Sequence, residues 1–141
     1  MKQQSPELAN TIYRLGHIER ILVDQALTPY QLRMNHARVL NYLHRHPGST
    51  QKELAEFLDY QQASLTNLIN HLEERQMLVR KVDPNNGRQK RLYLQTAGKQ
   101  VLQKTDRIFD ELNELFSDID PQVDQLLQEK VTYLRKTGQL K

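Results

Sequence analysis

The stretch from Ser49 to Gly98 constrains the fold more than any other part of this sequence. It contains two helix-length segments joined by a short connection, and a hairpin-like segment follows them. Thr50 with Glu53 three residues later forms a capping-box pattern, which predicts a helix from Thr50 to about Leu58. Apolar residues at three- and four-residue steps predict a second helix from about Gln62 to Arg75. The side chains expected to be buried in these two helices are Leu54, Phe57, Leu58, Leu65, Leu68, Ile69 and Leu72.

Two short strand candidates, Val79–Val82 and Arg91–Leu94, flank the turn segment Pro84–Gly87. Asn and Gly tolerate positive φ, so this segment predicts a hairpin turn. The residues from Arg75 to Arg91 include six bases and a single acid, Asp83. The six bases are Arg75, Arg80, Lys81, Arg88, Lys90 and Arg91. The balance reverses to acidic over residues 101–125, and this asymmetry favours an approach to a polyanion, with merely solvated charged faces as the alternative.

The flanking segments are predicted to be helical, which gives a mainly α fold with a small β-hairpin wing. The first helix, from about Pro6 to Ala26, carries an amphipathic stripe at Leu8, Ile12, Leu15, Ile18 and Leu22. Further helices are expected over about Asn35–His46, from a Thr96 cap to about Ser117, and from an Asp120 cap onwards. We therefore expect three parts, with helical ends at residues 1–34 and 99–141, whose apolar faces a second subunit could cover, around a mixed helix-and-hairpin middle at 35–98.

Composition narrows the class of protein. A chain of 141 residues fits one domain, and its mean hydropathy of −0.75 indicates a limited core that a second subunit could extend. The sequence has no cysteine, which removes disulfides, thiol nucleophiles and cysteine-based zinc sites. No signal-peptide core or membrane-length apolar run occurs, so we expect a cytoplasmic protein that makes no membrane contact. No residue pattern supports a cofactor or an enzyme activity.

The second helix of the pair has a polar face suited to a DNA groove. With its apolar residues buried, the helix exposes Gln62, Ala63, Thr66, Asn67 and Asn70. Gln and Asn side chains can bond the adenine edge, and Ala and Thr methyls suit the thymine methyl. The other explanation is an ordinary polar helix face.

The basic hairpin supplies the second half of the predicted interface. Arg88, Lys90 and Arg91 suit phosphate or minor-groove contacts, which give affinity and register more than sequence choice. Thr50 and Gln51, at a helix start, could offer a hydroxyl and backbone N–H groups to a phosphate. The helix and the hairpin together favour double-stranded DNA as the partner.

Three segments in this order and spacing resemble the MarR family of winged helix-turn-helix transcriptional regulators. They read ARVLNYLHRHPGSTQKELAEFL, SLTNLINHLEERQMLVR and DPNNGRQKRLYLQTAG. The resemblance implies a homodimer held by intertwined N- and C-terminal helices, with two winged domains on one pseudo-palindromic operator. It also implies transcriptional control, usually repression, that a small-molecule effector often relieves.

Transferred residue by residue, the resemblance makes Gln61 to Asn67, including Ser64, the groove-facing start of a recognition helix, and it makes Arg88 a wing arginine. Four positions depart from the family pattern, one of them Gln95 in place of a common Thr. Gln61 replaces a Ser or Thr N-cap, Gln76 replaces a helix-ending Gly, and Asn86 replaces a frequent wing Asp. Gln76 is therefore expected to adopt a left-handed conformation at a cost of about 1 kcal/mol. The complete predicted DNA-binding set is Thr50, Gln51, Gln61, Gln62, Ala63, Ser64, Thr66, Asn67, Asn70, Arg88, Lys90 and Arg91.

The resemblance also directs attention to the first two helices, where family members place effector pockets. His17 shares a helix face with Tyr13 and Arg20, and His36 begins the next helix, so these four residues form a candidate effector site. A surface or dimer-interface polar cluster is the alternative. No His pair has the spacing of a metal site on one helix face, and no metal is expected. Two rival functions remain at this point: a winged-helix protein-interaction module without DNA binding, and a small-molecule- or metal-binding protein without a DNA function.

Overall fold

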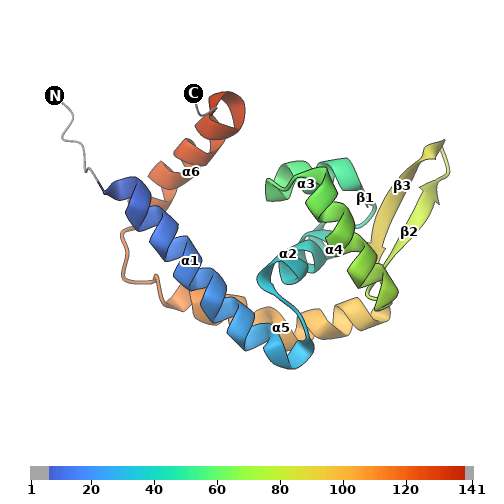
Figure 1. Ribbon diagram of the computed structural model, residues 1–141, viewed down its shortest axis with the longest axis horizontal. Coiled ribbons are helices and arrows are strands. Elements are labelled where there is room, and N and C mark those ends of the chain that lie inside the picture. Colours follow the sequence, from blue (N-terminus) through green and yellow to red (C-terminus); the bar gives the residue numbers. More distant parts are fainter. Residues whose placement is uncertain (1–6, 139–141) are drawn as a thin grey trace. The chain divides into compact units, whose positions relative to one another are not determined.

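A computed structural model describes residues 7–138 of the chain (Figure 1). It is mainly helical with one small antiparallel sheet, as predicted. The chain separates into two units between Phe109 and Asp110, inside the fifth helix. The predicted limits 1–34, 35–98 and 99–141 stay a prediction. The elements are α1 (Leu8–Leu27), η1 (Thr28–Tyr30), α2 (Met34–Arg45), β1 (Ser49–Thr50), α3 (Gln51–Leu58), α4 (Gln62–Glu74), β2 (Leu78–Asp83), β3 (Asn86–Leu94), α5 (Thr96–Glu114) and α6 (Pro121–Thr137).

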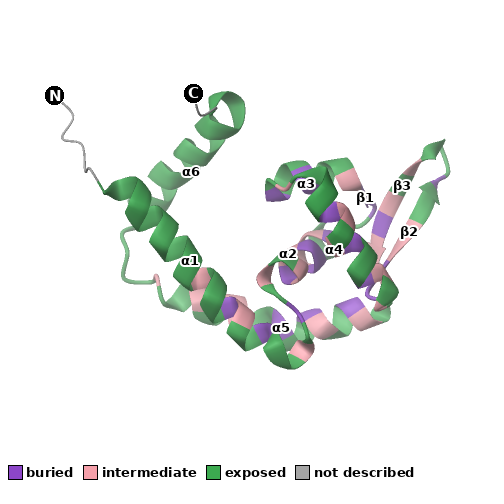
Figure 2. Cartoon of the chain, viewed as in Figure 1, coloured by how far each residue is buried: buried purple, intermediate pink, exposed green. Residues whose placement is uncertain are grey.

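The core of the first unit lies among α2, α3, α4 and the sheet (Figure 2). Its fully buried side chains include Leu40, Leu43, Leu54, Leu65, Ile69, Leu72, Leu78 and Leu92. Two predicted core residues are placed differently. Leu68 is only half-buried, and Phe57 is 52% exposed because it packs on the outer side of α3 against the Tyr42 ring, 4.6 Å between centroids.

The helix ends largely follow the predicted chemistry. Thr50 Oγ1 accepts a hydrogen bond from Glu53 N at 3.2 Å, and Glu53 Oε2 accepts one from Thr50 N at 3.1 Å, so the capping box is confirmed. The Gln61 side chain does not cap α4, and Gln76 has a φ of 58°, as expected from the departures of these two residues from the family pattern. The helix α5 begins at Thr96 rather than after it. The Ser5–Pro6 start of the first helix lies outside the described residues.

The sheet has the strand order β1-β3-β2. Its hairpin turns over two residues, Pro84 and Asn85, because Asp83 pairs with Asn86. The predicted turn is confirmed, but it needs no positive φ, since among the described residues only Gln31, Gly48, Asp59 and Gln76 have it. We call the hairpin β2–β3 the wing. It extends from the α2–α4 helices as a two-stranded arm (Figure 1).

Apolar side chains remain on the surface of each unit taken by itself. In α1 only Val23 and Leu27 are buried, while the predicted stripe at Leu8, Ile12, Leu15, Ile18 and Leu22 is 44–55% exposed. In α6 every residue is exposed, including the apolar Val123, Leu126, Leu127, Val131 and Leu134 (Figure 2). Both helices therefore carry apolar faces that nothing in their own unit covers. Within residues 7–138, no helix is both long and apolar enough to span a membrane.

Candidate nucleic-acid interface

The outward face of α4 is held in place from behind. Leu65, Ile69 and Leu72 are fully buried and fix the helix against the core. Ala63 and Asn67 on the opposite face and Gln62 in the first turn are exposed, and the side-chain amides of Gln62 and Asn67 have no hydrogen bond within the described part of the chain. We call these three residues the reading face. Their donors and acceptors are available to an external partner on a rigid helix.

Four other predicted residues of this helix differ in availability. Gln61 and Ser64 are exposed at its start. Thr66 is half-buried, and its hydroxyl donates to Gln62 O at 2.8 Å while accepting from Gln51 Nε2 at 2.7 Å. Asn70 Oδ1 accepts from Arg80 Nη2 at 2.6 Å. The side chains of Gln51 and Asn70 therefore join α4 to α3 and to the wing, in addition to any role at the interface.

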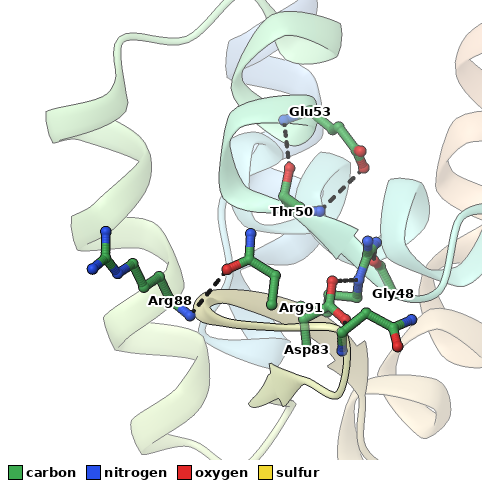
Figure 3. Close-up of polar contacts among 8 residues, drawn as sticks. Gly48, Thr50, Glu53, Asp83, Arg88 and Arg91 are labelled. Atoms are coloured by element: carbon green, nitrogen blue, oxygen red, sulfur yellow. Dashed lines mark hydrogen bonds and ion pairs between the residues drawn. The ribbon is translucent and has the colours of Figure 1, made fainter.

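The Thr50 hydroxyl is not available at the surface, unlike what the sequence predicted. The residue is only 5% exposed, and its hydroxyl is occupied by the α3 cap (Figure 3). The predicted contact between this hydroxyl and a phosphate therefore conflicts with its burial. Thr50 instead fixes the start of α3. It lies in strand β1, beside the wing, where it pairs with Arg91.

Five of the six bases from Arg75 to Arg91 fall into two groups that charge counting did not distinguish, and the sixth, Lys81, is exposed with its Nζ 5.2 Å from the centroid of the Tyr93 ring. Arg75 donates to the carbonyl oxygens of Tyr30 and Gln31, at 2.9 and 2.7 Å, and Arg80 bonds Asn70. By contrast, Arg88 and Lys90 are exposed and make no side-chain hydrogen bond or ion pair in the described structure. The exposed bases without a side-chain hydrogen bond, ion pair or ring contact among the described residues, Arg88 and Lys90, therefore lie toward the far end of the wing.

Arg91 belongs to the internally held group, and its predicted phosphate or minor-groove contact stays a prediction. Its Nε donates to Asp83 Oδ2 at 2.8 Å, and its Nη1 donates to Gly48 O at 2.9 Å (Figure 3). Asp83 is 6% exposed, and its other oxygen accepts from Asn85 N at 2.9 Å. The Asn85 N–H and the Arg91 guanidinium lower the pKa of Asp83, and Asp83 in turn raises the pKa of Arg91.

A cavity of about 670 Å³ lies between α1, α2 and α4, with Asp24, Arg33, His36 and His71 in its lining. The rings of His36 and His71 are 5.0 Å apart, and His36 Nδ1 accepts from Arg33 N at 3.1 Å. Burial is the main cause that lowers the pKa of His36, followed by the charges of His71, Arg75 and Arg33. The site therefore favours a neutral His36 beside cationic neighbours.

The four predicted effector residues do not come together in this cavity. His36 lines it, whereas Arg20 lines a smaller adjoining cavity of about 140 Å³ that shares Asp24 and Arg33. Tyr13 and His17 stack on each other at 6.1 Å and line neither cavity. Sequence reasoning missed His71, because no periodic pattern links it to His36 at such a separation in the chain. Among the described residues there is no cluster of three metal-binding side chains.

An exposed polar helix face, a capped preceding helix and a basic hairpin together define a winged helix-turn-helix protein. Residues 30–89 match the model of the MarR family. The chain is also similar to the structure of a DNA complex of MepR from S. aureus, with 25% identity, a TM-score of 0.80, and coverage of 90% of this chain and 95% of that one.

Two further solved structures share the fold. CouR from Rhodococcus jostii RHA1, bound to p-coumaroyl-CoA, is 21% identical with a TM-score of 0.82 and full coverage of both chains. The transcriptional regulator SlyA is 20% identical with a TM-score of 0.80, covering 92% of each chain. The MarR-family model therefore matches the helix pair and part of the wing, and the fold of these solved regulators extends over 90% or more of the chain.

Proposed function

We propose that this protein is a homodimeric, sequence-specific DNA-binding regulator that acts as a ligand-responsive repressor on a pseudo-palindromic operator. The observation that carries the proposal is the pairing, within one unit, of the reading face of α4 with the exposed Arg88 and Lys90 of the wing. The first group suits base edges and the second suits phosphates. A relative that is 25% identical, MepR, has been solved in complex with DNA, which supports the same partner here.

The dimer is supported by the uncovered apolar faces. The α1 stripe and the α6 residues expose leucines, isoleucines and valines in numbers that a monomer would leave in water. Two copies would place two α4 helices in successive major grooves, about 34–36 Å apart. Each reading face is small, so the second copy supplies much of the affinity.

The effector proposal rests on the cavity lined by His36 and His71. It touches both α2 and α4, so a bound molecule there could alter the position of the reading helix. CouR, which shares the fold, was solved with p-coumaroyl-CoA bound. Of the predicted effector residues, we retain His36 and Arg20 for this role.

A salt titration of binding tests the proposed function. Fluorescence anisotropy with DNA fragments, including the region around the protein's own gene, should show sequence-preferring binding that weakens steeply with salt. Sedimentation of the same sample should give a dimer. Absence of salt-sensitive binding on every fragment would favour the rival interaction module, whose partner would then be a protein.

A further inference from the structure

Part of the wing has no partner on the neighbouring strand. Val82 pairs with Lys90, but the next residue of β2, Asp83, pairs with Asn86. The register therefore skips residues 87–89 of β3, which include Arg88. Because the regular ladder does not hold this segment, other contacts must fix where the Arg88 guanidinium lies.

The contacts that close this segment come from Asp83 and Arg91. Asp83 stands at the end of β2, and Arg91 follows Lys90 on β3, so their ion pair joins the two sides of the irregular segment. Asp83 also binds Asn85 N in the turn. Asn86 Oδ1 accepts from Arg88 N at 3.2 Å, which fixes the backbone but leaves the guanidinium without an acid partner (Figure 3).

Arg91 also contacts a third segment, the residues just before strand β1. Arg91 Nη1 donates to Gly48 O, and Gly48 N donates to Leu92 O at 2.9 Å, immediately before strand β1 and the capped start of α3. Gly48 has φ of 83°, and a β-carbon there would lie 3.1 Å from the Tyr93 hydroxyl. Glycine therefore suits the position where the chain turns beneath Arg91.

We infer that Asp83, Arg91 and the Gly48 carbonyl form a wing clamp that holds residues 87–89 in place and so positions Arg88 for DNA, with Arg91 making no phosphate contact itself. This inference rests on the proposed function, because it assigns a positioning role within the same DNA interface. Arg91 and Asp83 are positioning residues in this account, while Arg88 and Lys90 carry the contacts.

The salt dependence of binding separates a clamp from a phosphate contact. Arg91→Ala should weaken binding about tenfold and flatten the slope of log K against log salt by about 0.9, the value of the Arg88 contact that it positions, and it should change neither quantity further in an Arg88→Ala background. The adjacent, exposed Lys90 is the matched control, and Lys90→Ala should flatten that slope by about 0.9. A further loss of affinity or a further flattening when Arg91→Ala is added to Arg88→Ala would overturn the inference.

For Asp83→Ala, the clamp and simple electrostatics predict opposite changes in DNA affinity. Removing an acid near DNA should strengthen binding if only charge matters, whereas loss of the clamp should weaken it. We expect Asp83→Ala to weaken binding about tenfold, and the double variant to be no weaker than either single variant, because both remove the same clamp. Tighter binding by Asp83→Ala, or additive losses, would contradict the clamp.

A conservative variant and a DNA-free measurement complete the test. Arg91→Lys keeps the charge but lacks the planar guanidinium that bonds Asp83 and the Gly48 carbonyl from two different nitrogens, so it should behave as Arg91→Ala does; a lysine as good as the parent would indicate a phosphate contact. NMR amide exchange without DNA should be faster at Gly48, Asn85 and Arg88 in the Asp83 and Arg91 variants and unchanged in Lys90→Ala. If the parent protein bound no DNA, the proposed function would fail, while unchanged exchange would refute the clamp by itself.

Discussion

The reading face of α4 and the wing present their side chains to solvent by different physical means. Behind the reading face, Leu65, Ile69 and Leu72 are fully buried, so non-directional packing sets the position of the helix. The wing has no such backing near its tip, and residues 87–89 depend on a few directional contacts. Sequence choice, which needs precise placement, is therefore assigned to the packed helix, and the less demanding phosphate contacts to the wing.

The largest expected effect comes from removing the packing behind the reading face. Leu65→Ala should lower the free energy of unfolding by about 2–5 kcal/mol, because the side chain is fully buried and leaves a cavity. Chemical denaturation measures the change, and Val82→Ala, whose side chain is 58% exposed on the wing, serves as the control. An effect below that of the control would mean that packing does not fix α4.

Asn67 tests the selectivity assigned to the same helix. Asn67→Ala should cost about 1–3 kcal/mol on the preferred sequence and relax the preference at one base position. Binding to a panel of single-base operator variants measures this. An equal loss on every sequence would move Asn67 from base reading to general contact.

Arg88 tests the phosphate contacts assigned to the wing. Arg88→Ala should weaken binding to all sequences by a similar factor and flatten the salt slope by roughly 0.9, the value of one phosphate. Anisotropy titrations at several salt concentrations give both numbers. A change in base preference would instead show that the wing also selects sequence.

Gln76 offers a smaller, stabilising change at the end of α4. Its φ of 58° is unfavourable for a side chain with a β-carbon, so Gln76→Gly should raise the free energy of unfolding by about 1 kcal/mol. A thermal melt at fixed protein concentration measures it, and DNA affinity should stay unchanged. A lower melting temperature would show that the Gln76 side chain contributes more than its backbone strain costs.

The smallest effect is the dependence of stability on pH through His36. Its pKa in the fold lies below the ordinary 6.5, so the unfolded chain binds a proton first as the pH falls. Stability should therefore decrease as the pH drops below about 6.5, and level off below the folded pKa. Urea midpoints across this window measure the effect, and His36→Asn, which keeps an acceptor for Arg33 N, should remove that part of it. Stability that rises on acidification would contradict the assignment.

Much of this architecture could be predicted from the residues, because it depends on local chemistry. Thr50 with Glu53 predicted the cap of α3, and apolar spacing predicted both helices of the central pair. Phe57 and Leu68 were misjudged, since periodicity shows which side of a helix is apolar but not how far a neighbouring element covers it. The hairpin was predicted, yet its turn uses no positive φ despite two asparagines and a glycine.

The candidate site could likewise be predicted only where local sequence patterns decide the structure. The exposure of the reading face follows from helix periodicity, and its DNA-binding role stays a prediction. The internal roles of Arg75, Arg80 and Arg91 did not follow from the sequence, because each contact joins segments separated by turns or whole elements. Charge counting sums all bases alike, whereas tertiary structure decides which of them remain available.

Selection of bound sequences from a random DNA pool tests the central claim most directly, with the parent, Asn67→Ala and Arg88→Ala proteins examined in parallel. The account predicts a palindromic parent motif with half-sites about 10–10.5 base pairs apart, centre to centre. It also predicts one relaxed base position per half-site in Asn67→Ala, and an unchanged motif at lower yield in Arg88→Ala. No enriched motif for the parent, or the same motif change in both variants, would contradict the assignment of base recognition to α4 and of phosphate contacts to the wing.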